Sequence, residues 1–198
     1  MAKSDNSFDD GGPVSDPRAN YDHHDDSVER PGLASDLDDL VDGDVRFDDY
    51  SRQLYATDAS IYEVTPVGVV YPTSTGDVSA VVEYCADREI PVLPRGGGTS
   101  LAGQTVNEAV VLDFTRYMDD VLEVDPDDRL ARAQSGTILA ELNRDLEPHD
   151  LKFAPDPSTA NRSAIGGAVG NNTTGAHSLL YGKTDAYVEE LEVVLADG

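Results

Sequence analysis

The sequence predicts a chain that mixes helices and strands, with a parallel βαβ unit followed by antiparallel strands. A short apolar run, a helical pattern and a second short apolar run follow one another from Val67 to Pro94. A glycine-rich run starts where the second predicted strand ends, the edge at which open α/β sheets bind ligands. Farther on, VLEVDPDDRLARAQSG has the pattern of a hairpin whose turn contains Asp125, Pro126 and Asp127.

The composition is strongly acidic. Thirty-nine Asp and Glu residues against 14 Lys and Arg give a formal net charge of −25. We predict no nucleic-acid partner, because a phosphate backbone requires a basic face that this chain cannot assemble. The acidic excess and the preference for Arg over Lys are typical of a halophilic, haloarchaeal-like protein, and an acidic, very soluble mesophilic protein is the alternative.

The cysteine content and the apolar runs indicate a cytoplasmic protein. Cys85 is the single cysteine and lies in the apolar pattern VVEYCA, so we interpret it as a core residue in a reducing compartment. The N-terminus, MAKSDNSFDDGGP, lacks the apolar region of a signal peptide. No apolar run approaches ~18 residues, so no transmembrane segment is predicted.

Residues 1–31 are predicted to form a disordered, acidic arm, and residues 32–198 a single domain. The arm holds almost no large aliphatic residues, so it cannot bury enough surface to offset its chain entropy. His23 and His24 lie in it beside three Asp residues, a superficially metal-like cluster. Because no scaffold surrounds them, we interpret them as a solvated patch and predict no metal site.

The domain is predicted to open with a short helix. Ser35 is the expected N-cap and Gly43 the end of this helix. Its apolar residues share one face: Leu37, Leu40 and Val41. The stretch RFDDYSRQLYATDASIYEVTP mixes aromatic and charged residues, and we expect irregular structure with a helical turn there.

The βαβ unit follows. GVVYP is predicted to be a buried strand, residues 77–88 a helix, and IPVLP the second strand. The residues that the helix should bury are Val78, Val81, Val82 and Cys85. Such strands must be parallel, with a right-handed crossover.

The remaining elements follow the glycine run. AVVLDF is a predicted strand, and Thr137 the predicted N-cap of a helix after the hairpin. That helix should line one side with Ile138, Leu139, Leu142 and Leu146. A second glycine-rich region, DPSTANRSAIGGAVGNNTTGAHSLLYG, precedes a last predicted strand, ELEVVLADG. Because a strand that ends in an Asp-Gly pair usually continues into another element, we expect these 198 residues to be the leading part of a longer polypeptide.

The run PRGGGTSLAGQT indicates a phosphate-binding loop rather than a turn, since a tight turn needs only one or two glycines. A Walker A loop matches from Gly98 to Thr105 except that Gln104 replaces the essential lysine. A dinucleotide fingerprint matches at its start, but its third glycine is displaced to Gly103 and the loop leads into a strand. Both familiar motifs are therefore imperfect.

A third possibility uses both glycine-rich regions. Backbone N–H groups and side-chain amides of the second region would bind another part of the same ligand. A pyrophosphate held by two loops needs neither lysine nor Mg²⁺, which suits FAD better than ATP. The residues of the second region that fit this role are Ile165, Gly166, Gly167, Asn171, Asn172 and Gly175.

Four ordered blocks carry a resemblance to a known family: YATDASIYEVTPVGVVYPTSTGDV, PVLPRGGGTSLAGQ, PDPSTANRSAIGGAVGNNTTGAHSLLYG and VEELEVVLADG. From about Arg52 to Gly198 the chain resembles the PCMH-type FAD-binding domain of the vanillyl-alcohol oxidase superfamily, in its glycolate oxidase and cytochrome-type D-lactate dehydrogenase branch. The resemblance implies an α+β fold, with a small parallel βαβ subdomain followed by a larger mixed or antiparallel sheet subdomain with helices. FAD would lie between the two.

The resemblance also implies the cofactor-binding residues. The first glycine run would enclose the FAD pyrophosphate, and the second region would line the rest of the cofactor channel. These residues are Gly96, Gly97, Gly98, Thr99, Ser100, Gly103, Gln104, Pro157, Ser158, Gly166, Gly167, Asn172 and Gly175. Relatives with covalent flavin often carry histidine in the first run, where this chain has Gly98 and Thr99, so noncovalent FAD is expected.

The activity implied by that branch is oxidation of a 2-hydroxy acid to a 2-oxo acid, with electrons passed to a quinone, a cytochrome or an iron–sulfur module. Another oxidoreductase of the superfamily and a non-redox nucleotide-binding module are the alternatives. No catalytic residue is assigned, and His177 is interpreted as a loop histidine rather than a base. Arg95 and Arg162 flank the glycine runs, either to assist the pyrophosphate charge or to form surface ion pairs.

Overall fold

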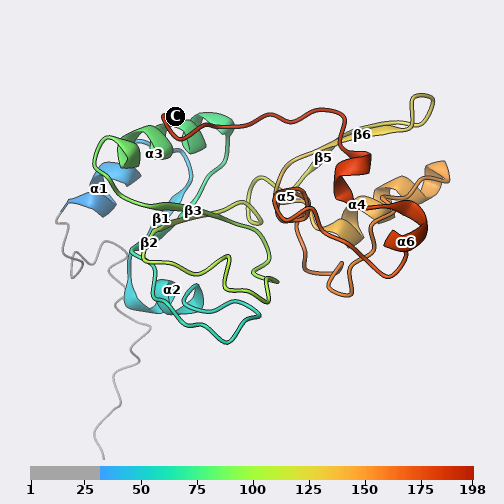
Figure 1. Cartoon of the computed structure of the whole chain (residues 1–198). Helices are drawn as coiled ribbons and strands as arrows, with labels where there is room; N and C mark the ends of the chain where they lie inside the picture. The colour runs from blue at the N-terminus through green and yellow to red at the C-terminus, as the bar shows by residue number, and fades with distance from the viewer. Residues whose placement is uncertain (1–31) are drawn as a thin grey trace, which may run out of the picture.

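The computed structural model describes residues 32–198, and the predicted arm with His23 and His24 lies outside them. The helices and strands are, in chain order, α1 (Leu33–Asp38), β1 (Asp44–Arg46), α2 (Asp49–Leu54), β2 (Gly68–Tyr71), α3 (Thr75–Ala86), β3 (Val92–Arg95), β4 (Val110–Asp113), β5 (Val121–Asp125), β6 (Leu130–Ala133), α4 (Leu139–Leu146), η2 (Glu147–His149), α5 (Ile165–Gly170), α6 (Ser178–Tyr181) and η3 (Thr184–Tyr187). The strands form a four-stranded sheet and a separate β5-β6 hairpin, so the fold is α+β (Figure 1).

The four-stranded sheet has the order β1-β2-β4-β3 and contains the predicted βαβ unit. β2 and β3 both pair in parallel with β4, and β1 pairs antiparallel with β2. The parallel orientation is therefore confirmed, and the predicted strand AVVLDF lies between the two strands of the unit. The glycine run leaves β3 at the carboxyl edge of this sheet.

The main core lies between the sheet and the helices α1 and α3, which cover one of its faces (Figure 1). The side chain of Ser74 accepts a hydrogen bond from the Asp77 N–H and caps α3. Val78, Val81 and Cys85 are buried on the inner side of α3, as predicted, whereas Val82 is only half-buried. On the opposite face of the sheet a smaller cluster of Val69, Tyr71 and Val111 packs with Tyr55 and Leu93.

The predicted hairpin is confirmed. β5 and β6 pair antiparallel, and the Asp125 carboxylate accepts the N–H groups of Asp127 and Asp128 in the turn. α4 follows and buries three of its four predicted apolar residues, Leu139, Leu142 and Leu146. The strands of the hairpin themselves are mostly exposed or half-buried.

Two predicted helix caps are wrong. α1 starts at Leu33, after Gly32 with a φ of 84°, so Ser35 lies inside the helix. Thr137 is fully buried and donates its hydroxyl to the Asp120 carbonyl oxygen at 3.0 Å, so it does not cap α4. For Thr137 the sequence showed a suitable hydroxyl but not the tertiary partner that decides its role.

The predicted first helix is also shorter than expected. α1 ends at Asp38, before Leu40 and Val41. Leu37 and Val41 are buried as predicted, whereas Leu40 is 44% exposed. Gly43 does not end the helix. A Cβ there would lie 2.0 Å from the Tyr71 carbonyl oxygen, so this glycine allows the chain entering β1 to pass close to β2.

The predicted last strand is wrong. Residues 189–198 form no strand, and the segment reaches α3, where the Gly198 carbonyl oxygen accepts a hydrogen bond from Ser79 (Figure 1). The alternating residues Leu191, Val193 and Leu195 are all exposed. The pattern is typical of a strand, but a helix has no free backbone groups to pair with one.

Candidate functional site

The first glycine loop, residues 96–105, leaves the carboxyl end of β3. Gly98 and Gly103 have φ values of 62° and 71°, a region that other residues rarely adopt. A Cβ on Gly98 would lie 2.6 Å from Nη2 of Arg95, and a Cβ on Gly103 would lie 2.6 Å from the Tyr62 ring. Backbone conformation and close packing both require glycine here.

The second glycine region, residues 156–182, contains α5. The Gly166 N–H donates to the Ser135 carbonyl oxygen at 2.8 Å, and a Cβ on Gly166 would lie 2.9 Å from Ser135. A Cβ on Gly175 would lie 2.3 Å from the Asp156 carbonyl oxygen. Gly167 differs, because a Cβ there would meet nothing within 4 Å. This part of α5 is open to an approaching ligand.

The two regions lie against each other. A Cβ on Gly97 would lie 1.8 Å from the Arg162 carbonyl oxygen, so only glycine allows this contact. The Thr99 and Ser163 hydroxyl oxygens are 3.2 Å apart, and Ser163 also bonds with Thr159 at 2.8 Å. Two segments far apart in the sequence therefore form one junction.

A second contact closes the junction at its exposed side. Gln104 Nε2 donates to Asn171 Oδ1 at 2.6 Å, and the Ser100 hydroxyl donates to Gln104 Oε1 at 2.7 Å. At the inner side a Cβ on Gly96 would lie 2.7 Å from the Ala164 Cβ. Four of the predicted residues of the first run thus contact the second region: Gly96, Gly97, Thr99 and Gln104.

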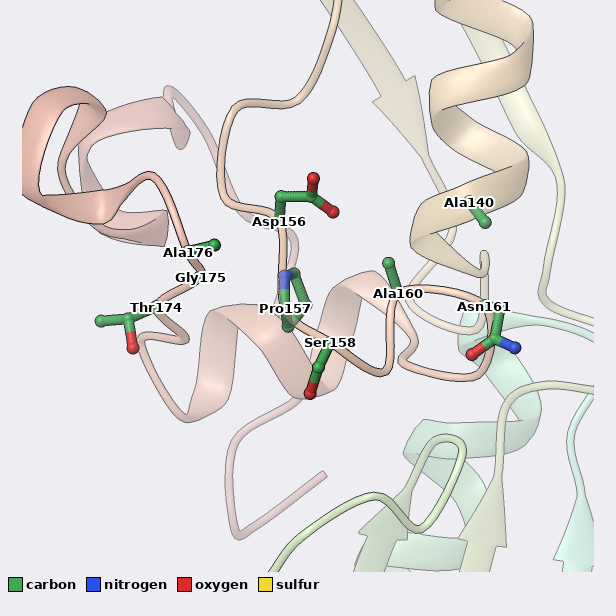
Figure 2. A pocket seen from close by; sticks show the side chains of 9 residues that line it. All are labelled: Ala140, Asp156, Pro157, Ser158, Ala160, Asn161, Thr174, Gly175 and Ala176. Atoms are coloured by element: carbon green, nitrogen blue, oxygen red, sulfur yellow. The ribbon is translucent and has the colours of Figure 1, made fainter.

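A pocket of about 770 Å³ lies in the second glycine region (Figure 2). Its lining residues are Ala140, Asp156, Pro157, Ser158, Ala160, Asn161, Thr174, Gly175 and Ala176. Three of the predicted residues, Pro157, Ser158 and Gly175, are among them, and none belongs to the first loop. Asn161 precedes Arg162 in the chain, so the pocket lies beside the junction.

Several predicted polar side chains are used within the protein. The Asn172 side chain accepts the Asp185 N–H at 3.0 Å, and Asn172 has a φ of 45°. Ser100 and Gln104 bond with each other. Main-chain N–H groups are accordingly the better candidates for binding a diphosphate than these side chains.

Arg95 lies beneath the first loop and is buried. Its guanidinium donates to three carbonyl oxygens, those of Tyr55, Thr57 and Thr105, at 3.0, 2.8 and 2.8 Å. Burial lowers the pKa of Arg95, and the nearby side chains of Tyr55, Asp113 and Asp58 oppose that change. Within residues 32–198 Arg95 therefore forms no surface ion pair, whereas Arg162 is exposed.

Tyr55 and Asp113 lie next to Arg95 and were not identified from the sequence. The Tyr55 hydroxyl donates to Asp113 Oδ2 at 2.5 Å, while Asp113 Oδ1 accepts the Thr115 N–H and hydroxyl, both at 2.7 Å. Burial, together with the Asp113 charge, raises the pKa of Tyr55 far above its usual value. Tyr55 thus stays protonated as a donor. The one feature of the sequence that could have pointed to this pair is Asp113, which ends the buried strand β4.

The remaining titratable candidates carry no assigned chemistry. His177 is exposed at the start of α6, with its ring centroid 6.4 Å from that of Tyr181, so it stays interpreted as a loop histidine. Within residues 32–198 no group of three or more His, Cys, Asp or Glu is placed to hold a metal ion. No helix in the same range has the length and apolar character needed to cross a membrane.

The family comparison identifies the chain. Residues 66–198 match the family model described as FAD binding domain. D-2-hydroxyglutarate dehydrogenase of Pseudomonas putida is 36% identical over 185 residues, which are 92% of this chain and 18% of that protein. Glycolate oxidase subunit GlcD of Bacillus subtilis is 37% identical over 162 residues, 80% of this chain and 34% of that protein.

Another relative, D-lactate dehydrogenase of Archaeoglobus fulgidus, is 39% identical over 66% of this chain and 29% of its own length. The chain thus spans between about a fifth and a third of the curated relatives named here.

Solved structures confirm the fold. An alkyldihydroxyacetonephosphate synthase matches with a TM-score of 0.68 and 23% identity, over 80% of this chain and 32% of that one. The 6-hydroxy-D-nicotine oxidase of Arthrobacter nicotinovorans matches with a TM-score of 0.63 and 23% identity, over 73% of this chain and 32% of that one. The architecture is the PCMH-type α+β fold that the sequence resemblance implied. The chain belongs to the FAD-binding domain family, and its cofactor is FAD.

Proposed function

We propose that residues 32–198 are the FAD-binding part of a flavin-dependent oxidoreductase that converts a 2-hydroxy acid into a 2-oxo acid. The observation that carries this proposal is the junction of the two glycine regions, where Gly97 meets the Arg162 carbonyl oxygen. The FAD diphosphate lies at this junction, held by main-chain N–H groups of both regions. The residues proposed to bind FAD are Gly96, Gly97, Gly98, Thr99, Ser100, Gly103, Gln104, Pro157, Ser158, Gly166, Gly167, Asn172 and Gly175.

Gly167 supports a backbone approach by the cofactor. Glycine inside a helix costs about 1 kcal/mol relative to alanine. No tertiary contact requires glycine at Gly167, since outside its chain neighbours and the α5 backbone nothing lies within 4 Å of the place where a Cβ would stand, and Gly170 in the same helix is equally open. A ligand that touches the α5 backbone does explain that cost, because a methyl group would then stand between them.

The role of these residues is to bind and orient. FAD supplies the hydride acceptor when bound, and the protein fixes its position relative to the substrate. The first glycine loop contains neither histidine nor cysteine, with Gly98 and Thr99 at its centre, so the flavin is held noncovalently. The pocket beside Pro157, Ser158 and Gly175 continues the binding surface away from the diphosphate.

The names of the relatives support a short list of substrates. They are named for D-2-hydroxyglutarate, glycolate and D-lactate, each a 2-hydroxy acid. A quinone, a cytochrome or an iron–sulfur module accepts the electrons. We further propose a cytoplasmic protein adapted to high salt, on the strength of its charge of −25 and its single cysteine, which is buried.

The test is reconstitution of the full-length protein with FAD in low and in molar KCl, followed by anaerobic addition of candidate substrates. We expect a yellow protein that releases unmodified FAD on denaturation. Addition of a D-2-hydroxy acid should bleach the flavin absorbance, and the L-enantiomer should do so far more slowly. A protein that takes up no FAD at either salt concentration would contradict the proposal. Flavin that stays attached after denaturation would contradict the proposed noncovalent binding.

A further inference from the structure

The first glycine loop is held from beneath by two charged side chains that its glycine motif does not include. Arg95, at the start of the loop, binds the carbonyl oxygens of Tyr55, Thr57 and Thr105. Among residues 32–198 no carboxylate lies within ion-pair distance of its guanidinium. The charge of Arg95 is therefore directed to main-chain oxygens on both sides of the loop.

Asp58 holds the other end of the loop. Its Oδ2 accepts the Thr105 hydroxyl at 3.0 Å and the Thr105 N–H at 3.4 Å, and its Oδ1 accepts the Ser60 N–H at 2.8 Å. Burial acts to raise the pKa of Asp58, but the hydrogen bonds from Ser60 and Thr105 outweigh it and the net pKa is lowered. Asp58 is thus a carboxylate at neutral pH.

Thr105 is consequently fixed at three atoms, its carbonyl oxygen by Arg95 and its N–H and hydroxyl by Asp58. The segment that carries Asp58 also binds the middle of the loop, since the Ala59 N–H donates to the Gly98 carbonyl oxygen at 3.1 Å. An inward-turned carbonyl oxygen cannot face a diphosphate, whose negative charge it would repel. The Gly98 and Thr105 carbonyl oxygens therefore already accept hydrogen bonds within the protein, from the Ala59 N–H and from Arg95.

We propose that Arg95 and Asp58 are positioning residues that hold the first glycine loop in its anion-binding shape before FAD arrives. Neither touches the cofactor. A loop that is already ordered spends less binding free energy on becoming ordered, so its anchors strengthen FAD binding without contacting FAD. This inference rests on the proposed function, because it assumes that the loop binds the diphosphate.

Thr105→Val gives the cleanest test, since it removes the hydroxyl that Asp58 accepts and keeps the size of the side chain. Thr73→Val is the matched control. The Thr73 hydroxyl donates to Asp77 Oδ2 at 2.8 Å, and the Thr73 N–H donates to the same oxygen, so the local chemistry is the same. That pair lies at the start of α3, outside the proposed cofactor site.

The measurements are FAD titrations followed by flavin fluorescence and urea unfolding of the FAD-free protein, both with full-length protein. Thr105→Val should raise the FAD dissociation constant about fivefold, the loss expected for one hydrogen bond. Thr73→Val should lower the urea midpoint, because it too removes one hydrogen bond, and leave the dissociation constant within about twofold. Equal dissociation constants for Thr105→Val and wild type, or equal weakening by both variants, would overturn the proposal.

Arg95 is tested by a graded pair of substitutions. Arg95→Lys keeps the positive charge but has fewer N–H donors for the three carbonyl oxygens. Arg95→Met removes the charge and the donors. We expect FAD affinity to fall in the order wild type, Lys, Met, with partial rescue by lysine. If Arg95→Met does not fold, Arg95→Lys and Thr105→Val still decide the matter. A wild-type protein that takes up no FAD would instead overturn the proposed function, and the inference with it.

Discussion

The two glycine regions of the molecule are built in different ways. The first loop is attached to a sheet whose central strands, β2 and β4, are buried along their whole length, and Arg95 and Asp58 fix its ends. The second region rests on the short helix α5, tied down mainly by main-chain bonds such as Ile165 N–H to the Thr137 carbonyl oxygen. The hairpin next to it is largely exposed. The two clusters of buried apolar residues therefore lie in the first half of the domain.

The glycines themselves differ in the same way. Gly97 is glycine because a backbone oxygen of the protein lies 1.8 Å from where its Cβ would be. At Gly167 no atom outside its chain neighbours and the α5 backbone lies within 4 Å of that position. We therefore propose that Gly97 serves the assembly of the site, whereas Gly167 leaves space for the approach of the cofactor. Substitutions at the two positions should consequently separate stability from binding.

The largest effect is expected for Gly97→Ala. The new methyl group would collide with the Arg162 carbonyl oxygen, so the two regions must move apart. We expect a loss of about 1–3 kcal/mol in the free energy of unfolding. FAD affinity should fall by about a hundredfold, as for two lost charge-assisted hydrogen bonds. Urea unfolding and FAD titration measure both quantities, and an alanine variant that binds FAD normally would break the comparison.

Gly167→Ala should have opposite effects on stability and binding. The FAD-free protein gains about 1 kcal/mol from the better helix former. FAD binding weakens about tenfold, because the methyl group displaces one hydrogen bond to the diphosphate. The same two measurements apply.

Gly76→Ala in α3 is the control for Gly167→Ala. A Cβ at Gly76 would approach only the Ser74 hydroxyl oxygen, at 3.4 Å, so the helix should again be stabilised. FAD affinity should stay unchanged, since α3 is not in the proposed site. If the two alanine variants behave alike toward FAD, the assignment of Gly167 is wrong.

A smaller effect is expected where the two regions meet through exposed side chains. Gln104 and Asn171 form a direct hydrogen bond of 2.6 Å. A double-mutant cycle of Gln104→Ala and Asn171→Ala should give a coupling energy of about 0.5–1 kcal/mol in FAD binding. Each single variant should weaken FAD binding about threefold. Strictly additive losses would show that this contact does not join the regions.

The smallest effect concerns acid stability in the first half of the domain. Burial acts to raise the pKa of Asp77, but hydrogen bonds from Thr73, Asp42 and Ser74 outweigh it and lower the pKa below the ordinary value. The folded-state pKa is thus below the unfolded one, so this stabilisation is complete above about pH 4 and is lost as the pH falls further. Asp77→Asn should flatten unfolding free energy against pH in that window. An unchanged slope would contradict the assignment.

The buried sheet was predictable from local sequence because its signal is local. Runs such as GVVY and VVLD are apolar throughout, as strands covered on both faces must be, and both are buried in the structure. The first glycine loop begins where β3 ends, at the end of the predicted strand IPVLP. The local hydrophobic pattern agrees with the structure for these strands, because their burial can be inferred without knowing which segments they contact.

The failures share one cause, a tertiary partner that no local pattern reveals. Thr137 looks like a helix cap, but the Asp120 carbonyl oxygen takes its hydroxyl. Tyr55 and Asp113 are 58 positions apart, so nothing in the sequence pairs them. The sequence also showed Gly97 and Gly167 as equivalent glycines. Only the structure distinguishes the contact at one from the open space at the other.

The central claim is that both glycine regions hold one FAD diphosphate through their backbone N–H groups. Hydrogen–deuterium exchange of the full-length protein, with and without FAD, measures those groups directly. When FAD is bound, we expect the backbone N–H groups of residues 96–105 and 163–175 to exchange more slowly, with little change in the β5-β6 hairpin. Protection of only one glycine region, or of neither, would contradict it.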